Sequence, residues 1–250
     1  MGRICRAAWA VARGAGLAVG ISVAQVVFVR FVDPPFTLTM LGRVAEGLAD
    51  GEGLRGWSRD VAGLEQLGDT VPRAVVASED GRFFLHGGFD WSSVCDAVEA
   101  RASGRRLRGA STISQQTAKN VFLWQGRSWV RKGLEVWYTA LLELLVPKER
   151  ILELYLNVAE TGPRVFGVEA GAEHHFGKSA RALSPEEAAR LAGIFPDPRD
   201  RSVDGQAARE RSRWIVANPA PFPGDRGFDR VSAAWDADWH GPWECLPGLR

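Results

Sequence analysis

The sequence predicts a mainly α-helical protein in which one apolar helix precedes a single sizeable domain. Residues 14–32 form an apolar run long enough to cross a membrane. Further along, apolar residues recur at helical spacing behind recognisable helix caps, whereas the alternating pattern of strands is scarce. The chain has 250 residues, of which 46% are hydrophobic, so it can build a real core and wholesale disorder is excluded.

The apolar run reads GAGLAVGISVAQVVFVRFV and is interrupted only by Ser22, Gln25 and Arg30. A helix over these residues spans roughly 28 Å, close to the hydrocarbon thickness of about 30 Å. Arg30 lies near the end of the run, where we expect its guanidinium to reach the lipid headgroups. Pro34 and Pro35 then end the helix, because proline lacks the amide donor and clashes with the preceding turn.

Arginines ahead of the run set its expected orientation. They stand at positions 3, 6 and 13, so the positive-inside rule keeps the short N-terminal tail in the cytoplasm. We therefore expect a single-pass protein of the inner (cytoplasmic) membrane whose later residues are periplasmic or otherwise extracytoplasmic. Two alternatives stay open: a buried core helix, and a signal peptide cleaved at the small-x-small segment 22–24. The anchor is favoured because the apolar run continues past this segment to Val32.

Composition divides the chain into four parts: tail and anchor (1–33), linker and lead-in (34–64), main domain (65–218) and C-terminal tail (219–250). Helices are expected, weakly near 38–48, and over 71–80, 91–101, 111–123, 127–145, 148–157, 166–175 and 184–194. The clearest start is Ser184-Pro185-Glu186-Glu187, which combines a serine cap, an early proline and a glutamate three residues after the cap. In the tail, tryptophans at 235, 239 and 243 predict an amphipathic segment that packs back on the domain.

Charge and cysteine content narrow the function classes. The formal net charge is +1, which argues against a chain that coats nucleic acid, and no nucleic-acid partner is expected. Three cysteines are too few for a disulfide framework, and their positions lack the CxxC spacing of common zinc sites. A bond between Cys95 and Cys245 stays open. No dedicated metal site is expected.

The first candidate for chemistry is the acidic pair Glu79-Asp80 at a predicted helix end. Phe83 and His86 follow it closely. A carboxylate beside aromatic rings is partly desolvated, which raises its pKa and suits it to proton transfer. The alternative is a solvated helix end followed by a turn.

The second candidate is the segment GASTISQQ at 109–116, which concentrates hydroxyls and amides at a predicted helix start. Thr112 and Gln115 have the spacing of a capping box. Together with the free N–H groups of the first turn, such side chains bind phosphate or sugar oxygens. Capping alone is the alternative, although it needs only one or two of these groups. Lys119 and Asn120 follow on the same helix.

The third candidate is the group Arg131, Lys132 and Glu135 on the long helix predicted over 127–145. Spacings of three and four residues bring all three side chains to one side of the helix. The alternative is a surface ion pair, which contributes only a few tenths of a kcal/mol.

These groups belong to five blocks that occur in a fixed order between residues 65 and 200. The blocks are Glu79-Asp80-x-x-Phe83-x-x-His86-x-Gly88-x-Asp90, Gly109 to Gln116 with Lys119-Asn120, Arg131-Lys132-x-x-Glu135, Lys148-x-x-Ile151-Leu152-Glu153-x-Tyr155-Leu156-Asn157, and Phe166-Gly167-Val168-Glu169-Ala170 with Phe176-Gly177-Lys178 and the helix after Leu183. This combination resembles the peptidoglycan glycosyltransferases, family 51 of the glycosyltransferases. The chain is similar to the monofunctional biosynthetic type, related to the glycosyltransferase domain of class A penicillin-binding proteins. One departure is His175, where relatives commonly carry tyrosine.

The resemblance implies a lysozyme-like, mainly α domain with a membrane-facing jaw. Its substrates are implied to be lipid II as acceptor and a lipid-linked glycan strand as donor, with polyprenyl pyrophosphate as the leaving group. Glu79 is implied to be the general base and Glu135 the second essential carboxylate. Substrate-binding roles are implied for Asp80, Phe83, His86, Ser111, Thr112, Gln116, Lys119, Asn120, Arg131 and Lys132.

The resemblance implies no required cofactor, while a divalent cation stays open, and other cell-wall synthesis proteins are expected partners beside the membrane. Two rival functions remain: a lysozyme-like peptidoglycan hydrolase, and a catalytically silent scaffold of the cell-wall machinery.

A final expectation concerns the arginines at 101, 105, 106 and 108. They would attract the anionic headgroups of the membrane, and the alternative is that they simply form a solvated loop.

Overall fold

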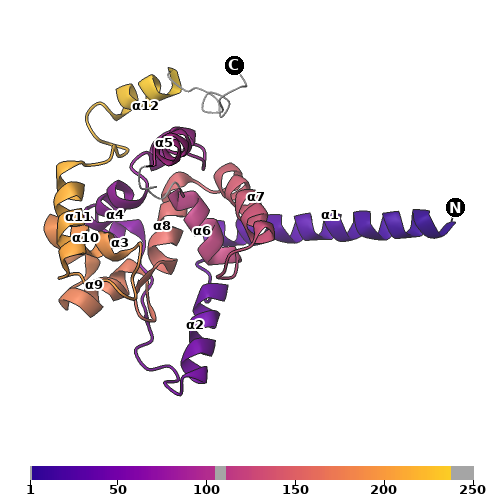
Figure 1. Cartoon of the computed structure of the whole chain (residues 1–250), viewed down its shortest axis with the longest axis horizontal. Helices are drawn as coiled ribbons and strands as arrows, with labels where there is room; N and C mark the ends of the chain where they lie inside the picture. The colour runs from indigo at the N-terminus through magenta and orange to yellow at the C-terminus, as the bar shows by residue number, and fades with distance from the viewer. Residues whose placement is uncertain (1, 105–110, 238–250) are drawn as a thin grey trace.

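A computed structural model of the chain describes residues 2–104 and 111–237 and confirms the mainly α prediction (Figure 1). Within this described part, the α-helices are α1 (Gly2–Phe31), α2 (Leu38–Ala49), α3 (Leu64–Leu67), α4 (Thr70–Glu79), α5 (Trp91–Ala102), α6 (Ile113–Phe122), α7 (Trp129–Leu145), α8 (Lys148–Val158), α9 (Val168–Phe176), α10 (Pro185–Ile194), α11 (Gln206–Ala217) and α12 (Phe228–Ala237). Two short 3-10 turns, η1 (Phe83–Leu85) and η2 (Ala180–Ala182), complete the helical structure.

Helix α1 extends away from the domain as a single long rod (Figure 1). Its segment Arg6–Phe31 is long and apolar enough to cross a membrane, and most of that segment is exposed. The helix ends at Phe31, two residues before the Asp33-Pro34-Pro35 stop. These properties are consistent with the predicted membrane anchor.

The last turns of α1 are joined to the domain through α7. Ser22 Oγ accepts a hydrogen bond from Trp137 Nε1 at 3.0 Å, and Gln25 Oε1 accepts one from the Tyr138 hydroxyl at 2.6 Å. Arg30 donates to the carbonyl of Leu145 at 2.7 Å. The Arg30 guanidinium thus satisfies a carbonyl at the C-terminal end of α7. Its expected contact with the lipid headgroups stays a prediction.

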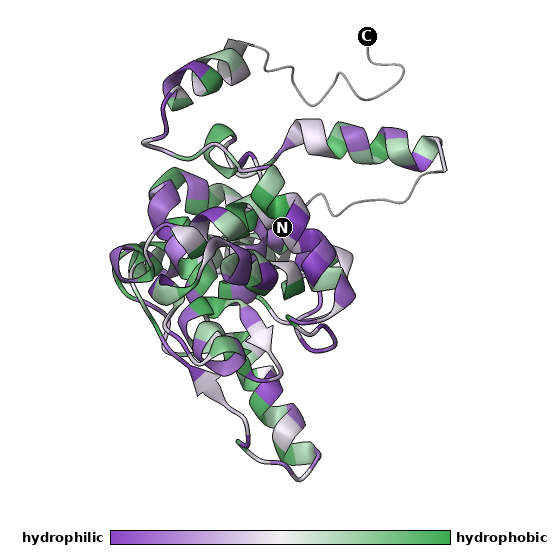
Figure 2. Cartoon of the chain, turned by 90° about the vertical axis from the view of Figure 1, so that its left-hand side faces the viewer, coloured by the Kyte–Doolittle hydropathy of each residue, from purple (hydrophilic) through white to green (hydrophobic). Residues whose placement is uncertain are grey.

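The domain core lies between two helix groups, α4 with α10 and α11, and α6 with α7 and α8. Helix α8 is buried along most of its length, with Leu152, Leu154 and Leu156 fully enclosed. In Figure 2, helices that mix hydrophobic and hydrophilic residues surround this core, as expected for amphipathic elements. Helices α5 and α12 stand at one end of the domain in both views.

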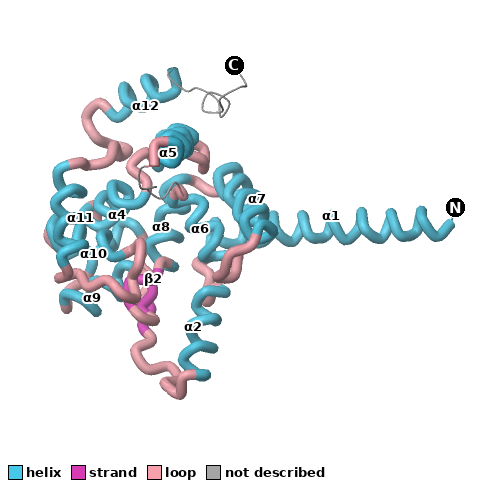
Figure 3. The backbone as a smooth tube through the Cα atoms, viewed as in Figure 1, coloured by secondary structure: helices cyan, strands magenta, loops and turns pink. Residues whose placement is uncertain are grey.

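A small sheet holds the start of the domain to its middle (Figure 3). The strands are β1 (Ser58–Arg59), β2 (Glu160–Gly162) and β3 (Val165–Phe166), in the order β1-β3-β2. β1 pairs with β3 in parallel and β2 pairs with β3 antiparallel. Gly167 follows β3 at a φ of +88°, and a Cβ there would lie 2.8 Å from the carbonyl oxygen of Asp60, so this crossing needs glycine.

The C-terminal segment packs back on the domain, which confirms the expectation for Trp235. The guanidinium of Arg82 lies 5.0 Å from the Trp235 ring, and Phe222 packs edge-on against Phe84 at 4.7 Å. The other two tryptophans, at 239 and 243, lie outside the described residues. So does Cys245, whereas Cys95 is disulfide-bonded.

The arginine-rich segment is only partly covered by the structure. Arg101 is exposed in the last turn of α5. The arginines at 105, 106 and 108 lie outside the described residues, and their expected role stays a prediction.

Candidate active site

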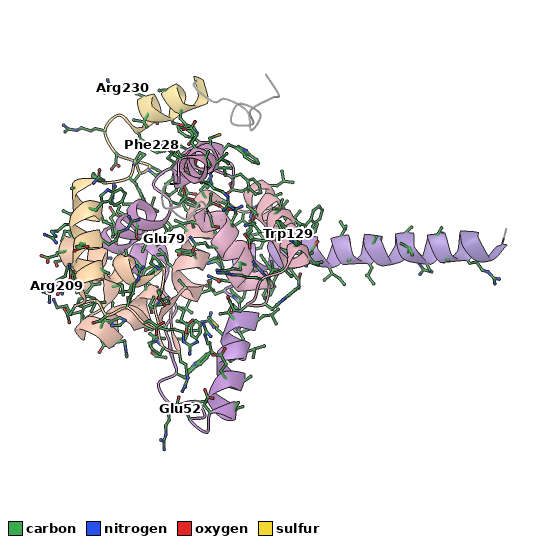
Figure 4. All side chains as sticks on the ribbon, viewed as in Figure 1. Glu52, Glu79, Trp129, Arg209, Phe228 and Arg230 are labelled. Atoms are coloured by element: carbon green, nitrogen blue, oxygen red, sulfur yellow. The ribbon has the colours of Figure 1, made fainter. Side chains whose placement is uncertain are left out.

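The candidate site begins at the end of α4, where Glu79 lies near the centre of the domain (Figure 4). Helix α4 is apolar along most of its length and packs against α10, which fixes the direction of its last turn. Glu79 Oε2 accepts a hydrogen bond from Gln116 Nε2 at 3.2 Å. Gln116 Oε1 in turn accepts one from the Tyr155 hydroxyl at 3.1 Å. The chain Tyr155–Gln116–Glu79 thus links α8, α6 and α4.

The surroundings of Glu79 favour its neutral form. Burial raises the pKa of its carboxyl above the ordinary value, and the hydrogen bond from Gln116 and the charge of Arg211 only partly oppose this effect. A carboxyl with a raised pKa accepts a proton more readily than an ordinary glutamate, which is the property of a general base. Tyr155 responds to the same environment: burial first, and then the charge of Glu79, raise the pKa of its hydroxyl.

Asp80 has a different role from that of Glu79, because its carboxylate hydrogen-bonds both the following loop and the start of α6. His86 Nε2 lies 3.0 and 3.1 Å from the two Asp80 oxygens, and the backbone N–H of Ile113 donates to Oδ2 at 2.9 Å. Thr112 Oγ1 donates to the carbonyl of Gly88 at 2.7 Å. These bonds hold residues 81–88 against the start of α6.

Four residues that the sequence assigned to substrate binding are enclosed within the protein. They are Asp80, Phe83, His86 and Thr112, all at most 8% exposed. Phe83 lies beneath the loop, with the ammonium of Lys148 4.3 Å from its ring centroid. The surrounding contacts use these side chains for internal packing and hydrogen bonding.

The start of α6 differs from the expected anion site. Thr112 and Gln115 form the predicted capping box, in which Thr112 Oγ1 accepts from Gln115 N at 3.2 Å and Gln115 Oε1 accepts from Thr112 N at 3.0 Å. Asp80 takes the N–H of Ile113. The N–H groups of Thr112, Ile113 and Gln115 therefore already donate to protein oxygens, so these three are not free for a substrate phosphate. The binding of phosphate or sugar oxygens by the other groups of this segment stays a prediction. Ser111, just ahead, is exposed.

A cation group gathers where α6 packs beside α7. Glu135 is only 4% exposed and accepts from Arg131 at 2.8 Å and, on its other oxygen, from Lys132. Burial lowers the pKa of Lys119, the repulsion of Arg131 and Lys132 lowers it further, and the charges of Glu135 and Glu79 oppose both effects. Lys119 is therefore close enough to interact with both predicted carboxylates. Asn120, next along α6, is partly exposed.

Arg131 keeps one donor unused. Its guanidinium is mostly enclosed, at 12% side-chain exposure, yet its Nε lacks a hydrogen-bond partner among the described residues. A buried donor without a partner is costly unless a ligand or water satisfies it. This donor belongs to the cation group that the sequence predicted.

Two residues near Glu79 were missed as site residues. Tyr155 was visible in the fourth block, where it directly follows Leu152-Glu153-Leu154 and could have been assigned to the site. Arg211 comes from α11, a helix that the sequence did not predict. Its guanidinium donates to the carbonyl of Ser78, next to Glu79.

Other features bear on metal binding and on the departure at His175. Across residues 2–104 and 111–237, no three His, Cys, Asp or Glu side chains converge as a metal site. His175 Nε2 hydrogen-bonds the carbonyl of Thr161 at 2.6 Å, so the histidine keeps a ring and a hydrogen bond at this position.

Comparisons with known proteins place the chain in a family. Residues 50–219 match the family described as Transglycosylase. A protein of Xanthomonas oryzae pv. oryzae named biosynthetic peptidoglycan transglycosylase is 50% identical over 210 residues, covering 81% of this chain and 86% of the relative. A Xylella fastidiosa protein of the same name is 49% identical over 215 residues, covering 84% and 87%. The chain therefore belongs to the transglycosylase family.

Proposed function

We propose that this protein is a peptidoglycan glycosyltransferase, which polymerises lipid II into glycan strands and releases polyprenyl pyrophosphate. The observation that carries the proposal is the placement of Glu79, whose carboxylate accepts a hydrogen bond at 3.2 Å from Gln116 of α6, the same helix that carries Lys119 of the cation group. A base beside fixed cations suits a reaction in which a hydroxyl attacks and a pyrophosphate leaves. Family membership supports the same reaction.

In the proposed step, Glu79 removes the proton from the 4-hydroxyl of the lipid II acceptor. The hydroxyl oxygen attacks C1 of the donor strand, and the bond between C1 and the pyrophosphate oxygen breaks with inversion at C1. The electron pair of that bond leaves with polyprenyl pyrophosphate, and the proton stays on Glu79. Gln116 holds the Glu79 carboxylate through its amide N–H during this transfer.

The leaving pyrophosphate carries negative charge, which Lys119, Arg131 and Lys132 stabilise in this proposal. The unused Nε donor of Arg131 supplies one hydrogen bond to a phosphate oxygen. Glu135 orients Arg131 and Lys132 through its two oxygens. Ser111 and Asn120 provide further polar contacts at the accessible edge of α6.

The enclosed residues receive a different role. We assign Asp80, Phe83, His86 and Thr112 to shaping the loop after Glu79, since their polar atoms already have protein partners or their rings are buried. Their loss would disturb the site through the position of the loop.

The proposed location is the inner membrane, with the N-terminal tail in the cytoplasm and the domain outside it. The apolar span of α1 and the arginines ahead of it support this orientation. Other cell-wall synthesis proteins are proposed as partners. No resident metal is proposed. A divalent cation would enter with the substrate's pyrophosphate, a role that can be tested by adding a chelator to the assay.

The deciding experiment incubates the purified full-length chain in detergent or vesicles with lipid II, and in parallel with finished glycan strands. The proposal expects polymer and free polyprenyl pyrophosphate from lipid II, and finished strands left intact. Shortening of finished strands would establish the hydrolase instead. Binding of lipid II without any polymer, under conditions where a related enzyme is active, would establish the silent scaffold.

A further inference from the structure

A side chain of α11 hydrogen-bonds the backbone at the C-terminal end of α4. Arg211 donates from its guanidinium to the carbonyl oxygen of Ser78 at 2.5 Å. This carbonyl belongs to the last turn of α4, where carbonyl groups lack partners within the helix. The bond therefore fixes the backbone directly next to Glu79.

We propose that Arg211 is a positioning residue for the transfer reaction, which fixes the end of α4 through the carbonyl of Ser78 and places a positive charge beside Glu79. The inference rests on the proposed function, because it assigns Arg211 a role through the proposed base. It adds a residue that lies outside the blocks recognised in the sequence, on a helix 133 positions further along the chain.

The packing of α11 leaves Arg211 little freedom to move. Ala208 and Ile215 are buried on the same helix, and Ser212 donates to the carbonyl of Glu186 in α10 at 3.4 Å. Gly193 of α10 allows the close approach, since a Cβ at this position would lie 3.4 Å from Cβ of Arg211. The stem of Arg211 is thus confined between two helices.

The head of Arg211 is confined as well. Its guanidinium carbon lies 4.5 Å from the centroid of the Trp214 ring, a distance typical of a cation–π contact. The same guanidinium donates to Ser78. Since α11 packs against both α10 and α4, the charge stays beside the end of α4.

Among the residues that the structure describes, four charged or titratable groups interact with Glu79 from the surrounding elements. Asp80 is its neighbour in the chain, Lys119 comes from α6, Tyr155 from α8 and Arg211 from α11. Among them Lys119 and Arg211 are the cations. Arginine keeps its charge at every pH of an enzyme assay, whereas the pKa of Lys119 is lowered, chiefly by burial.

The sign of the effect follows from these charges. The positive charge of Arg211 favours the ionised carboxylate and so lowers the pKa of Glu79, against the raising effect of burial. Without that charge, Glu79 would hold its proton up to a higher pH. Because only the ionised form accepts the proton of the acceptor hydroxyl, activity would then be lost over a wider acidic range.

The test measures the initial rate of lipid II polymerisation by the full-length chain as a function of pH. Arg211→Gln removes the charge, Arg211→Lys keeps it, and Arg209→Gln removes an exposed arginine that lies at the outer side of the same helix (Figure 4). We expect Arg211→Gln to move the acidic limb of the profile up by roughly one pH unit, a modest effect for a nearby charge. The limb of Arg211→Lys and of Arg209→Gln should stay where the parent has it.

A merely structural role predicts another pattern. If Arg211→Gln lowered the rate by the same factor at every pH and left the acidic limb in place, the proposal would be overturned. Melting temperatures of all variants show whether they are folded at the assay temperature. Should Arg211→Gln be unfolded there, Arg211→Met, which also removes the charge but keeps a long apolar stem, takes its place: a limb shifted to higher pH supports the proposal, and an unshifted limb overturns it.

Failure of the proposed function looks different from failure of this inference. A parent chain that makes no polymer from lipid II refutes the glycosyltransferase proposal before any variant is compared. A parent chain that polymerises normally, with an acidic limb that Arg211→Gln does not move, refutes only the role of Arg211.

Discussion

The amide of Gln116 joins Glu79 to Tyr155: its N–H group donates to the Glu79 carboxylate at 3.2 Å while its oxygen accepts from the Tyr155 hydroxyl at 3.1 Å. The tyrosine is only 2% exposed, and this bond gives its buried hydroxyl the hydrogen-bond partner that it needs. The bond also fixes which end of the Gln116 amide faces the carboxylate. A side chain that the sequence placed in a substrate-binding block thereby sets the position of the proposed base.

Replacing Gln116 with Leu should reduce polymerisation by about tenfold or more, within the range for losing a contact that orients a catalytic group. The lost hydrogen bond stabilised the ionised carboxylate, so its removal raises the pKa of Glu79 further and shifts the acidic limb of the rate profile to higher pH. Rate measurements across pH check both effects. Gln125→Leu is the matched control, because it also removes one side-chain hydrogen bond, from Gln125 Nε2 to the Thr39 hydroxyl at 2.6 Å, outside the Tyr155–Gln116–Glu79 chain. An unshifted limb would show that Gln116 does not tune the pKa of the base.

The parent enzyme should lose activity on the acid side at a pH above the ordinary glutamate pKa of about 4.3, because burial raises the pKa of Glu79. Glu79→Gln removes the proton acceptor and should lower polymerisation by about a hundredfold or more. Folding and lipid II binding should stay nearly intact, since glutamine keeps the shape of the side chain. Turnover near that of the parent would show that Glu79 is not the base.

Local signals predicted much of the helical part of this fold. The capping boxes at Thr112 and Ser184 are read from four adjacent residues, and both helices begin where these signals lie. Helix α11 was missed because Gln206–Ala217 carries many charged residues and buries only Ala208, Ser212 and Ile215. Strands β1 and β3 are two residues each and pair across more than a hundred positions, so neither segment contains a strand pattern of its own.

The sequence predicted which residues lie at the candidate site more reliably than which of their side chains face the protein interior. Glu79, Lys119, Arg131, Lys132 and Glu135 were identified by type and spacing, and the structure brings their charges close together. Spacing could not reveal that Asp80 and Thr112 turn inward, because this depends on where the loop at 81–88 meets α6. Nor could it reveal the contact between Arg211 and Ser78, which only the packing of α11 creates.

Lys132→Ala should weaken transfer mainly through the donor. The side chain of Lys132 is 41% exposed and forms an ion pair with Glu135. One ammonium N–H is used by this pair, and the remaining N–H donors can bind a pyrophosphate. We expect the KM for the lipid-linked donor to rise and kcat to fall by about tenfold or more. Arg127→Ala, on an exposed arginine just ahead of α7, controls for the loss of a surface charge. Unchanged donor binding and turnover would reduce Lys132 to a surface ion pair.

Asp80→Asn should destabilise the protein more than it changes the chemistry of the proposed base. The carboxylate is 7% exposed and accepts hydrogen bonds from the backbone of Ile113 and, through its two oxygens, interacts with His86. Asparagine replaces one oxygen with an NH2 group that cannot accept, so we expect the free energy of unfolding to fall by about 1–3 kcal/mol. Denaturant unfolding followed by tryptophan fluorescence measures this loss, with Asp96→Asn, on the exposed face of α5, as the control.

At a temperature where both variants are folded, the acidic limb of the Asp80→Asn rate profile should move slightly to lower pH, because the negative charge of Asp80 raises the pKa of Glu79. A variant as stable as the parent but unable to bind lipid II would return Asp80 to the substrate-binding group in which the sequence had placed it.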